Sequence, residues 1–409
     1  MWFDESDGTC YKGCERLVLN VLSGGLLRIG IFSNYYRPVI NGVVRSISIF
    51  REELIRQKHA VYVFAPEARG YEDAEPGILR YRAVEVRYPA VFALPIPFSR
   101  SISKLIPQLQ LDVIHSQHPV ALGQEAAHQA RRLGIPLVFT YHSHYEAYAP
   151  YIPFNQRMVK SLTREVVGAY LERCQRIVVP SESALALIGE AYPKVVGRLA
   201  VIPTPVDLRA YEHLDPMPIR ARYRLEGNFT FVVVTRLALE KGLRALLRAF
   251  ALLLKKRPEA RLLIVGDGPL YGHLVEQTEA LGIANQVVFA EAVPFEQVPQ
   301  YLAAGDAFVY ASLNETQGLA VAEAMAAGLP VVAMDAPGVR DTITDGVSGL
   351  LTPPEEVALA EGMCRLMDDS SLRARLSAGA RAAAVRYAVP DLTRKLIGVY
   401  EAAIAEMQG

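Results

Sequence analysis

Short apolar runs alternate with helix-length segments along almost the whole chain, and this alternation limits the possible folds more than any other feature. The first half contains RIGIFS, AVYVFAP, VIHSQ, LVFTYH, RIVVPS and AVIPT. The second half contains FTFVVVTR, RLLIVGDG, QVVFAEAV, AFVYAS and PVVAMD. Buried strands separated by helices are typical of βαβ units with parallel strands. We therefore predict an α/β protein with two doubly wound, Rossmann-like domains.

Charge and composition indicate where the domains meet. The stretch from Arg28 to Arg198 holds 21 Lys+Arg against 14 Asp+Glu, whereas the stretch from Leu199 to the end holds 20 against 25. The segment PTPVDLRAY lies close to this change of sign and reads as a linker. We predict domains over residues 27–205 and 206–385, followed by a final segment over 386–409. Residues 1–26, with their acidic start, are expected to form a disordered extension.

Composition also argues against several classes of protein. No apolar run of about 18 residues is free of charge and proline, which argues against a membrane-spanning helix. Four cysteines in 409 residues are too few for a disulfide framework. Cys10 and Cys14 lack a His or Cys pair at zinc-finger spacing, so we expect no metal there and a cytoplasmic location. We expect no nucleic-acid partner.

Polar side chains recur directly after the predicted strands. Ligands of doubly wound sheets bind beyond the carboxyl ends of the strands, so these positions are candidates for one ligand site between the two domains. They are Asn34, His115, His142, Ser181, Arg236, Asp267 and Glu315.

Two strand-to-helix loops could bind a diphosphate. Arg236 and Lys241 lie on one loop, where two cations neutralise a doubly charged group, although a solvated loop face is the alternative. Asn41-Gly42 precedes a predicted helix that starts near Val43, whose N-terminus would face an anion unless the pair is an ordinary turn. No Walker sequence and no G-x-G-x-x-G is present. An ATPase or a dinucleotide-binding enzyme is therefore less favoured.

The stretch NETQGLAVAEAMAAGLPVV (residues 314–332) carries two glutamates around a glycine. Glu315 lies in the loop before a small-residue helix, and Glu323 lies inside that helix. The N–H groups of Gly318 and Leu319 at the helix start are available to an anion. Each carboxylate can accept two hydrogen bonds from a vicinal diol. The pattern predicts that one diol belongs to a ribose and the other to a sugar.

His142 follows another strand, with His144 two positions later. The pair lacks a third ligand at a recognisable spacing for a metal. Two roles for His142 remain open: contact with a bound sugar, or a structural role with its hydrogen bonds made within the core.

With these residues in view, the chain resembles the retaining glycosyltransferases of family 4. The resemblance rests on the E-x7-E run of Glu315 and Glu323, on TRLALEKG, VGDGP and AAGLPVV. It implies the GT-B fold, with two domains facing across a cleft and a C-terminal helix that crosses back to the first domain. It also implies a nucleotide-sugar donor and an active site without metal or other cofactor.

The resemblance assigns roles residue by residue. Glu315 would hold the transferred sugar and Glu323 the ribose, while Arg236 and Lys241 would bind the diphosphate. His142 would contact the sugar near the reacting carbon. Donor binding would further involve Asp267 in VGDGP, Gly318, Leu319 and Gly42, which matches the second glycine of a loop that is usually Gly-Gly. Asn41 stands in place of the first.

Within the family, PVINGVV and FTYHSHYEAY look most like enzymes that glycosylate diacylglycerol or related lipids. This implies transfer of a hexose, glucose, from UDP-glucose to a lipid hydroxyl. We expect the enzyme to adsorb to the anionic inner face of the cell membrane. Residues 92–109 and a basic amphipathic helix over 155–176 would make this contact. A helix packed on its own sheet is the alternative.

Other functions remain open from the sequence. Within the family they are an enzyme with a soluble acceptor and a mannosyltransferase of the phosphatidylinositol type. From other classes they are a two-domain NAD-dependent dehydrogenase, which lacks its glycine-rich fingerprint here, and a non-catalytic sugar-binding module.

Overall fold

The computed structural model describes residues 25–86, 92–146 and 154–408, and they form two compact units. The first unit holds the described residues up to Val179, those of 187–202 and those from Thr393 onward. The second holds Pro180–Ala186 and Pro203–Leu392. Residues 1–24, which make up most of the expected extension and include Cys10 and Cys14, lie outside the described residues.

A seven-stranded sheet in which all neighbours pair in parallel forms the centre of the first unit. Its order is β3 (Ile78–Tyr81), β2 (Ala60–Pro66), β1 (Arg28–Phe32), β6 (Val113–Ser116), β7 (Leu137–Thr140), β8 (Arg176–Val179) and β9 (Leu199–Val201). The chain changes direction across the sheet between β1 and β6. The apolar runs are buried on both faces, as strands in a covered parallel sheet require.

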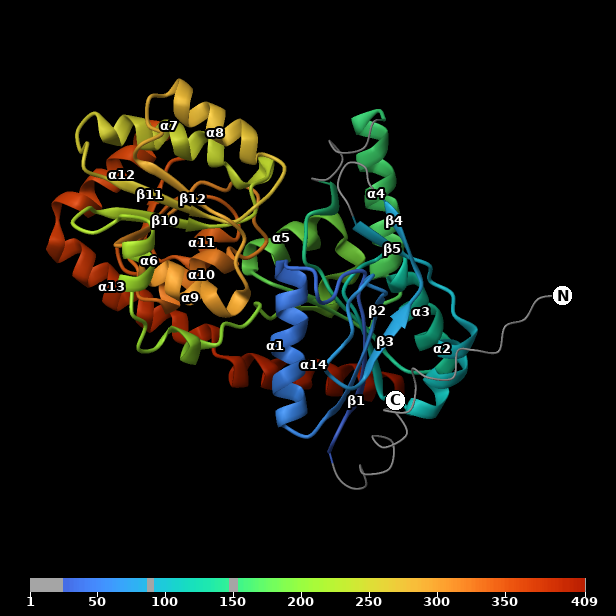
Figure 1. The fold of residues 1–409 in the computed structure, drawn as a ribbon. Helices are drawn as coiled ribbons and strands as arrows, with labels where there is room; N and C mark the ends of the chain where they lie inside the picture. Colours follow the sequence, from blue (N-terminus) through green and yellow to red (C-terminus); the bar gives the residue numbers. More distant parts are fainter. Residues whose placement is uncertain (1–24, 87–91, 147–153, 409) are drawn as a thin grey trace. The chain divides into compact units, whose positions relative to one another are not determined.

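Helices cover this sheet, with α1 on one side and α2 and α3 on the other (Figure 1). They are α1 (Gly42–Arg56), α2 (Arg100–Leu105), α3 (Leu122–Leu133) and α4 (Gln156–Leu171). A hairpin of β4 (Ala83–Val86) and β5 (Phe92–Pro95) adds an antiparallel pair. The helix expected over 155–176 ends earlier, at Leu171, because a turn and β8 follow it.

The second unit contains a six-stranded sheet, again parallel throughout. Its order is β12 (Val287–Ala290), β11 (Arg261–Val265), β10 (Thr230–Val234), β13 (Ala307–Tyr310), β14 (Val331–Met334) and β15 (Leu350–Thr352). The order reverses between β10 and β13. Both sheets are thus doubly wound, as predicted.

Helices lie on both faces of this second sheet. Figure 1 shows α7, α8 and α12 along one face and α9, α10 and α13 along the other. The helices are α6 (Met217–Arg222), α7 (Leu243–Leu254), α8 (Tyr271–Ala280), α9 (Val298–Ala303), α10 (Leu319–Ala326), α11 (Val339–Thr342), α12 (Glu356–Asp368) and α13 (Ser370–Ala384). Helices α5 (Glu182–Ala191) and α14 (Val389–Gln408) each contribute residues to both units.

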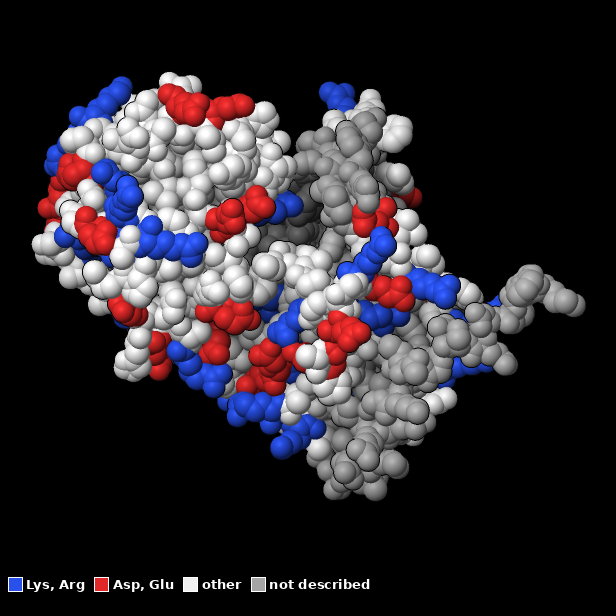
Figure 2. Space-filling view, viewed as in Figure 1, with Lys and Arg blue, Asp and Glu red and all other residues white. Residues whose placement is uncertain are grey.

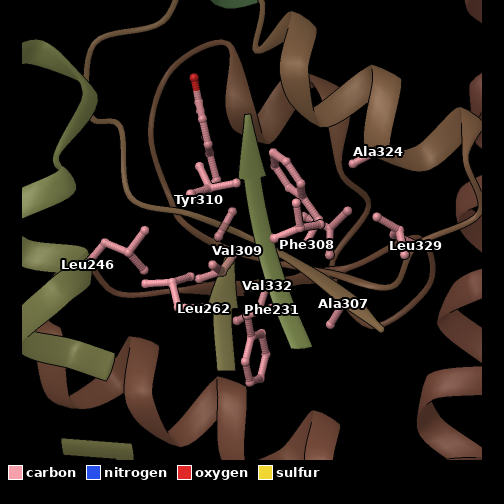
Figure 3. Close-up of a cluster of buried hydrophobic side chains, with 14 of the residues drawn as sticks. Phe231, Leu246, Leu262, Ala307, Phe308, Val309, Tyr310, Ala324, Leu329 and Val332 are labelled. Carbon is pink, nitrogen blue, oxygen red and sulfur yellow. The ribbon is translucent and has the colours of Figure 1, made fainter. Parts of the chain in front are cut away.

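The core of the second unit holds its strand ends in place. Figure 3 shows Phe231, Leu262, Val309 and Val332 from four adjacent strands packed in one cluster. These side chains have essentially no exposed surface. Because such a core is as dense as an organic crystal, the loops that follow the strands start from well-defined positions.

The end of the chain belongs to the first unit. Tyr400 on α14 and His115 on β6 are both buried, and the Tyr400 hydroxyl lies 2.8 Å from His115 Nδ1. Among the described residues, no helix is long and apolar enough to cross a membrane.

Candidate active site

The reversal between β10 and β13 places two loops side by side at the carboxyl edge of the second unit's sheet. The loop after β10 carries Arg236 and Lys241, and the loop after β13 carries Glu315. Ligands of doubly wound sheets bind at such a reversal. The loops also touch, since the Ser312 hydroxyl donates to the Glu240 carbonyl at 3.0 Å.

Lys241 and Glu315 form an ion pair at this edge. Lys241 Nζ donates to Glu315 Oε1 at 2.7 Å, and the Tyr310 hydroxyl donates to the same oxygen at 2.6 Å. The Lys241 and Glu315 side chains are 21% and 12% exposed, so both are largely desolvated yet open to a ligand. Charge-assisted hydrogen bonds of this kind are stronger than neutral ones and hold the carboxylate in one orientation.

Arg236 contacts a carboxylate on its own loop. Its guanidinium pairs with Glu240 on its own loop, and its side chain is 55% exposed. Lys241 pairs instead with Glu315, so the two cations of this loop have different carboxylate partners. The structure therefore brings Lys241 and Glu315 together and leaves Arg236 at the more solvated end of the loop.

Two glycines allow the loops after β10 and β14 to pack closely against the loop after β13. Gly242 has φ 65°, and a Cβ there would collide with the Ala311 carbonyl. Gly338 has φ 77°, and a Cβ there would lie 2.6 Å from the Glu315 carbonyl and 2.8 Å from Gln317 N. Only glycine occupies this region of φ without strain.

Gln317 anchors the loop between Glu315 and α10. Its amide is buried and bonds both main-chain groups of Thr204, accepting from N at 2.7 Å and donating to O at 3.0 Å. The Thr342 hydroxyl donates to the Gln317 carbonyl at 2.6 Å. The path of the chain into α10 is thereby fixed from both sides.

The start of α10 offers main-chain donors. Gly318 is the N-cap, with φ 75° and no side-chain cap. The N–H groups of Gly318 and Leu319 have no acceptor among the described residues. Glu323, one turn further on, is 5% exposed. An N-terminus of this kind, with a positive dipole end and available N–H groups, suits a phosphate.

Asp267 lies in the loop after β11, and its main chain bonds to the loop after β10. Its carbonyl accepts from Leu237 N at 2.9 Å, while its carboxylate Oδ1 accepts from Gly268 N at 2.6 Å. The side chain is exposed. Gly266 and Gly268 on either side allow this loop to pack against residues 235–237.

Gly42 and His142, to which the resemblance assigns donor and sugar contacts, lie in the first unit. Gly42 begins α1, where the Asn41 side chain caps the helix by accepting from Val44 N at 2.8 Å. His142 follows β7, and its Nε2 lies 2.7 Å from the Gln117 Oε1. Because an amide oxygen only accepts, Nε2 carries the proton. Burial lowers the pKa of His142 to about 4, so the ring is neutral at pH 7.

The turn after β6 supports this region. Its His118 accepts from Asn34 N through Nδ1 at 3.1 Å, and the Asn34 side chain accepts from Leu122 N at 3.0 Å. Asn34 therefore holds the turn between β6 and α3. Gln117 and His118 were not predicted as site residues, although both come directly after a strand.

A cavity of about 670 Å³ in the second unit lies elsewhere. It is lined by Phe229, Asp306 and Pro330, which come just before β10, β13 and β14. It therefore opens at the amino edge of the sheet, opposite to Lys241 and Glu315.

Comparison with known proteins gives this geometry its context. The family model described as "Glycosyl transferases group 1" matches residues 218–383, and that described as "Glycosyltransferase Family 4" matches residues 40–210. The α-monoglucosyldiacylglycerol synthase of Streptococcus pneumoniae is 33% identical, over 80% of this chain and 75% of its own length.

The chain belongs to glycosyltransferase family 4.

A further relative supports the activity class, and a solved structure supports the fold. The GDP-mannose-dependent α-mannosyltransferase of Mycobacterium tuberculosis is 30% identical, over 92% of this chain and 97% of its own. The solved sucrose-phosphate synthase of Thermosynechococcus elongatus is 21% identical, with a TM-score of 0.76 over 93% of this chain and 100% of its own. The GT-B fold and the resemblance to family 4 are thus confirmed, and the chain is a glycosyltransferase.

For this glycosyltransferase, the individual site roles stay predictions. Tyr310 and Gln317 join the predicted residues at the edge of the second sheet. Both belong to the run AFVYASLNETQG, but nothing in their spacing indicates which side chains they contact. In the part of the chain that the structure describes, no three His, Cys, Asp or Glu side chains gather to hold a metal ion.

Proposed function

We propose that this glycosyltransferase moves glucose from UDP-glucose to a membrane lipid hydroxyl, such as that of diacylglycerol or a glycolipid, with retention of the anomeric configuration. The observation that carries the donor part is the Lys241–Glu315 pair beside the start of α10. The acceptor part rests on the similarity to the S. pneumoniae α-monoglucosyldiacylglycerol synthase.

The leaving diphosphate gains negative charge as the glycosidic bond breaks. We propose that Lys241 and the N–H groups of Gly318 and Leu319 stabilise that charge, with Arg236 turning from Glu240 to the phosphates. Such preorganised donors favour the transition state over the bound substrate. They can take up this charge without an active-site metal, so the proposed reaction uses none. Gly42 is proposed as a further main-chain contact of the donor.

The two carboxylates are proposed to recognise hydroxyls of the donor. Glu315 accepts hydrogen bonds from the transferred sugar, and buried Glu323 accepts from the ribose. Asp267 is proposed to contribute to donor binding through its exposed side chain. His142, neutral at pH 7, is proposed to contact the transferred sugar through its ring.

Helix α4 is proposed as the surface that brings the enzyme to an anionic membrane on the inner face of the cell. Met158, Leu162 and Val166 are 60%, 59% and 39% exposed, and their spacing places them in one stripe. Arg157, Lys160 and Arg164 are exposed on the same helix. Figure 2 shows basic atoms beside uncharged ones at the outer end of α4. Apolar side chains flanked by basic ones suit an anionic lipid surface.

A mannosyltransferase is the second candidate. It is favoured by the 30% identity to the M. tuberculosis GDP-mannose-dependent enzyme over nearly the full length of both chains. Since UDP-glucose and GDP-mannose differ in both base and sugar, the donor separates the two proposals directly.

The test is a matrix of UDP-glucose, UDP-galactose and GDP-mannose against diacylglycerol, a glycolipid, phosphatidylinositol and a soluble sugar phosphate, with products read by mass spectrometry. We expect glucosylated lipid from UDP-glucose. Glu323→Gln and Arg236→Ala should each lower that turnover about 100-fold. Arg244→Ala, at an exposed position on α7 in the same unit, should leave it unchanged. Mannosyl transfer or a soluble product would replace the proposed function, and near-normal turnover of either site variant would remove its assignment.

A further inference from the structure

The Glu315 carboxylate is held asymmetrically. The hydrogen bonds from Lys241 Nζ and from the Tyr310 hydroxyl both end on Oε1, at 2.7 and 2.6 Å. Oε2 accepts neither of these two hydrogen bonds and is therefore the oxygen that remains to accept from a ligand. A carboxylate with one oxygen fixed by two donors has little freedom to rotate, so the direction of its second oxygen is set in advance.

Tyr310 is well placed to fix this direction. It is the last residue of β13, its side chain is 3% exposed, and its ring stacks on Phe308 with centroids 5.8 Å apart. Figure 3 shows the Tyr310 hydroxyl pointing away from the apolar cluster that contains its ring. Because the ring is locked in the core, the hydroxyl reaches Glu315 from a rigid support, whereas Lys241 reaches it through a flexible chain.

We propose that Tyr310 is a positioning residue whose hydroxyl aims Glu315 at the transferred sugar, so that discrimination between sugar epimers depends on it. The inference rests on the proposed role of Glu315 in sugar binding. Burial and the adjacent Glu315 charge raise the pKa of Tyr310 well above its usual value, so the hydroxyl remains a donor at any working pH. A hydrogen bond that orients a carboxylate also sets which hydroxyl of the sugar that carboxylate can accept from. Such a bond therefore contributes to selection between sugars that differ in one hydroxyl.

The alternative is a purely structural role, in which the carboxylate only satisfies a buried phenol. The two roles differ in what Tyr310→Phe changes. Loss of positioning lowers selectivity between donors that differ in one hydroxyl, whereas loss of structure lowers turnover of all donors together with binding of the nucleotide alone.

The experiment compares kcat/KM for two donor pairs that each share a nucleotide, UDP-glucose with UDP-galactose and GDP-mannose with GDP-glucose. In the pair that the wild-type enzyme uses, Tyr310→Phe should reduce the ratio of the two kcat/KM values about 10-fold. Its affinity for UDP or GDP alone, measured by calorimetry, should be unchanged. Tyr387→Phe, at a tyrosine that is also 3% exposed in the same unit, is the matched control and should change neither value.

A double variant tests whether Tyr310 acts through Glu315. In a Glu315→Ala background the selectivity is already lost, so adding Tyr310→Phe should change it no further. An unchanged preference in Tyr310→Phe, or an equal additional loss in the Glu315→Ala background, would overturn the proposal. The wild-type donor panel reports separately on the proposed function, since a preference for the GDP pair would reject UDP-glucose and leave the test of Tyr310 intact.

Discussion

At the scale of single residues, the candidate site depends on main-chain geometry as much as on charged side chains. The carbonyl of Glu315 packs against Gly338, and Gln317 is clamped by Thr204 and Thr342. A carboxylate that must meet a particular hydroxyl needs its own main chain held in place, because small displacements cost large factors in rate. The glycine after β14 is therefore as much a part of the site as Glu315.

Gly338→Ala should reduce turnover although Gly338 carries no side chain to contact a substrate. The new Cβ would lie 2.6 Å from the Glu315 carbonyl and would force the loop to shift. We expect about a 100-fold loss in kcat/KM. Gly346→Ala is the matched control, since Gly346 has φ 70° but no atom within 4 Å of a new Cβ. Both variants carry the strain of positive φ, so equal activities would show that the contact with Glu315 is unimportant.

At the scale of elements, α4 carries apolar residues on two faces. Val159, Val167, Tyr170 and Leu171 are buried, which accounts for packing within the first unit. Met158, Leu162 and Val166 form the second, exposed stripe, here called the α4 outer stripe. A helix needs only one apolar face to pack on its own domain, so the α4 outer stripe calls for another explanation.

Met158→Ser combined with Leu162→Ser should weaken adsorption to vesicles of phosphatidylglycerol and phosphatidylcholine. Losing two exposed apolar side chains should lower the partition coefficient about 10-fold or more, measured by co-sedimentation. Binding of the unchanged enzyme should fall as salt rises, because charge contributes to it. The paired control is Met217→Ser with Val357→Ser, which alters side chains 54% and 57% exposed in the second unit. If the two double variants co-sediment with the vesicles equally, the α4 outer stripe does not contribute to membrane adsorption.

At the scale of the whole molecule, the chain passes between its units more than once. Residues from Thr393 onward return to the first unit, so that unit is complete only when the last helix has been made. His115 links the last helix, α14, to the sheet of the first unit. Its Nδ1 lies 2.8 Å from the Tyr400 hydroxyl and its Nε2 lies 2.7 Å from the Thr140 hydroxyl. Burial lowers the pKa of His115 to about 3, so the ring is neutral and uses one nitrogen as donor and the other as acceptor.

Tyr400→Phe should destabilise the protein by about 1–3 kcal/mol, because it leaves a buried His115 nitrogen without its partner. The change should appear as a lower midpoint in urea unfolding followed by circular dichroism. Tyr71→Phe, at a tyrosine that is 38% exposed in the same unit, should leave the midpoint in place. A Tyr400→Phe midpoint equal to that of Tyr71→Phe would show that the hydrogen bond to His115 contributes nothing.

The sequence by itself determined the two doubly wound sheets and the loops that carry Lys241, Glu315 and the start of α10. These follow from local patterns, since strand periodicity, helix starts and the E-x7-E spacing are all visible within short windows. Strands β3 and β15 and the hairpin of β4 and β5 were not predicted. Charged residues interrupt the apolar runs of β3 and β4, and β15 offers only two apolar residues before Thr352 and a pair of prolines.

Only the tertiary structure decided which atoms meet. Tyr400 and His115 are 285 positions apart, Gln317 and Thr204 are 113 apart, and Lys241 and Glu315 are 74 apart. Nor could spacing indicate that Arg236 turns to Glu240 while Lys241 turns to Glu315. Such contacts depend on how buried strands and helices pack around a dense core, and side-chain direction is set there and not by local propensity.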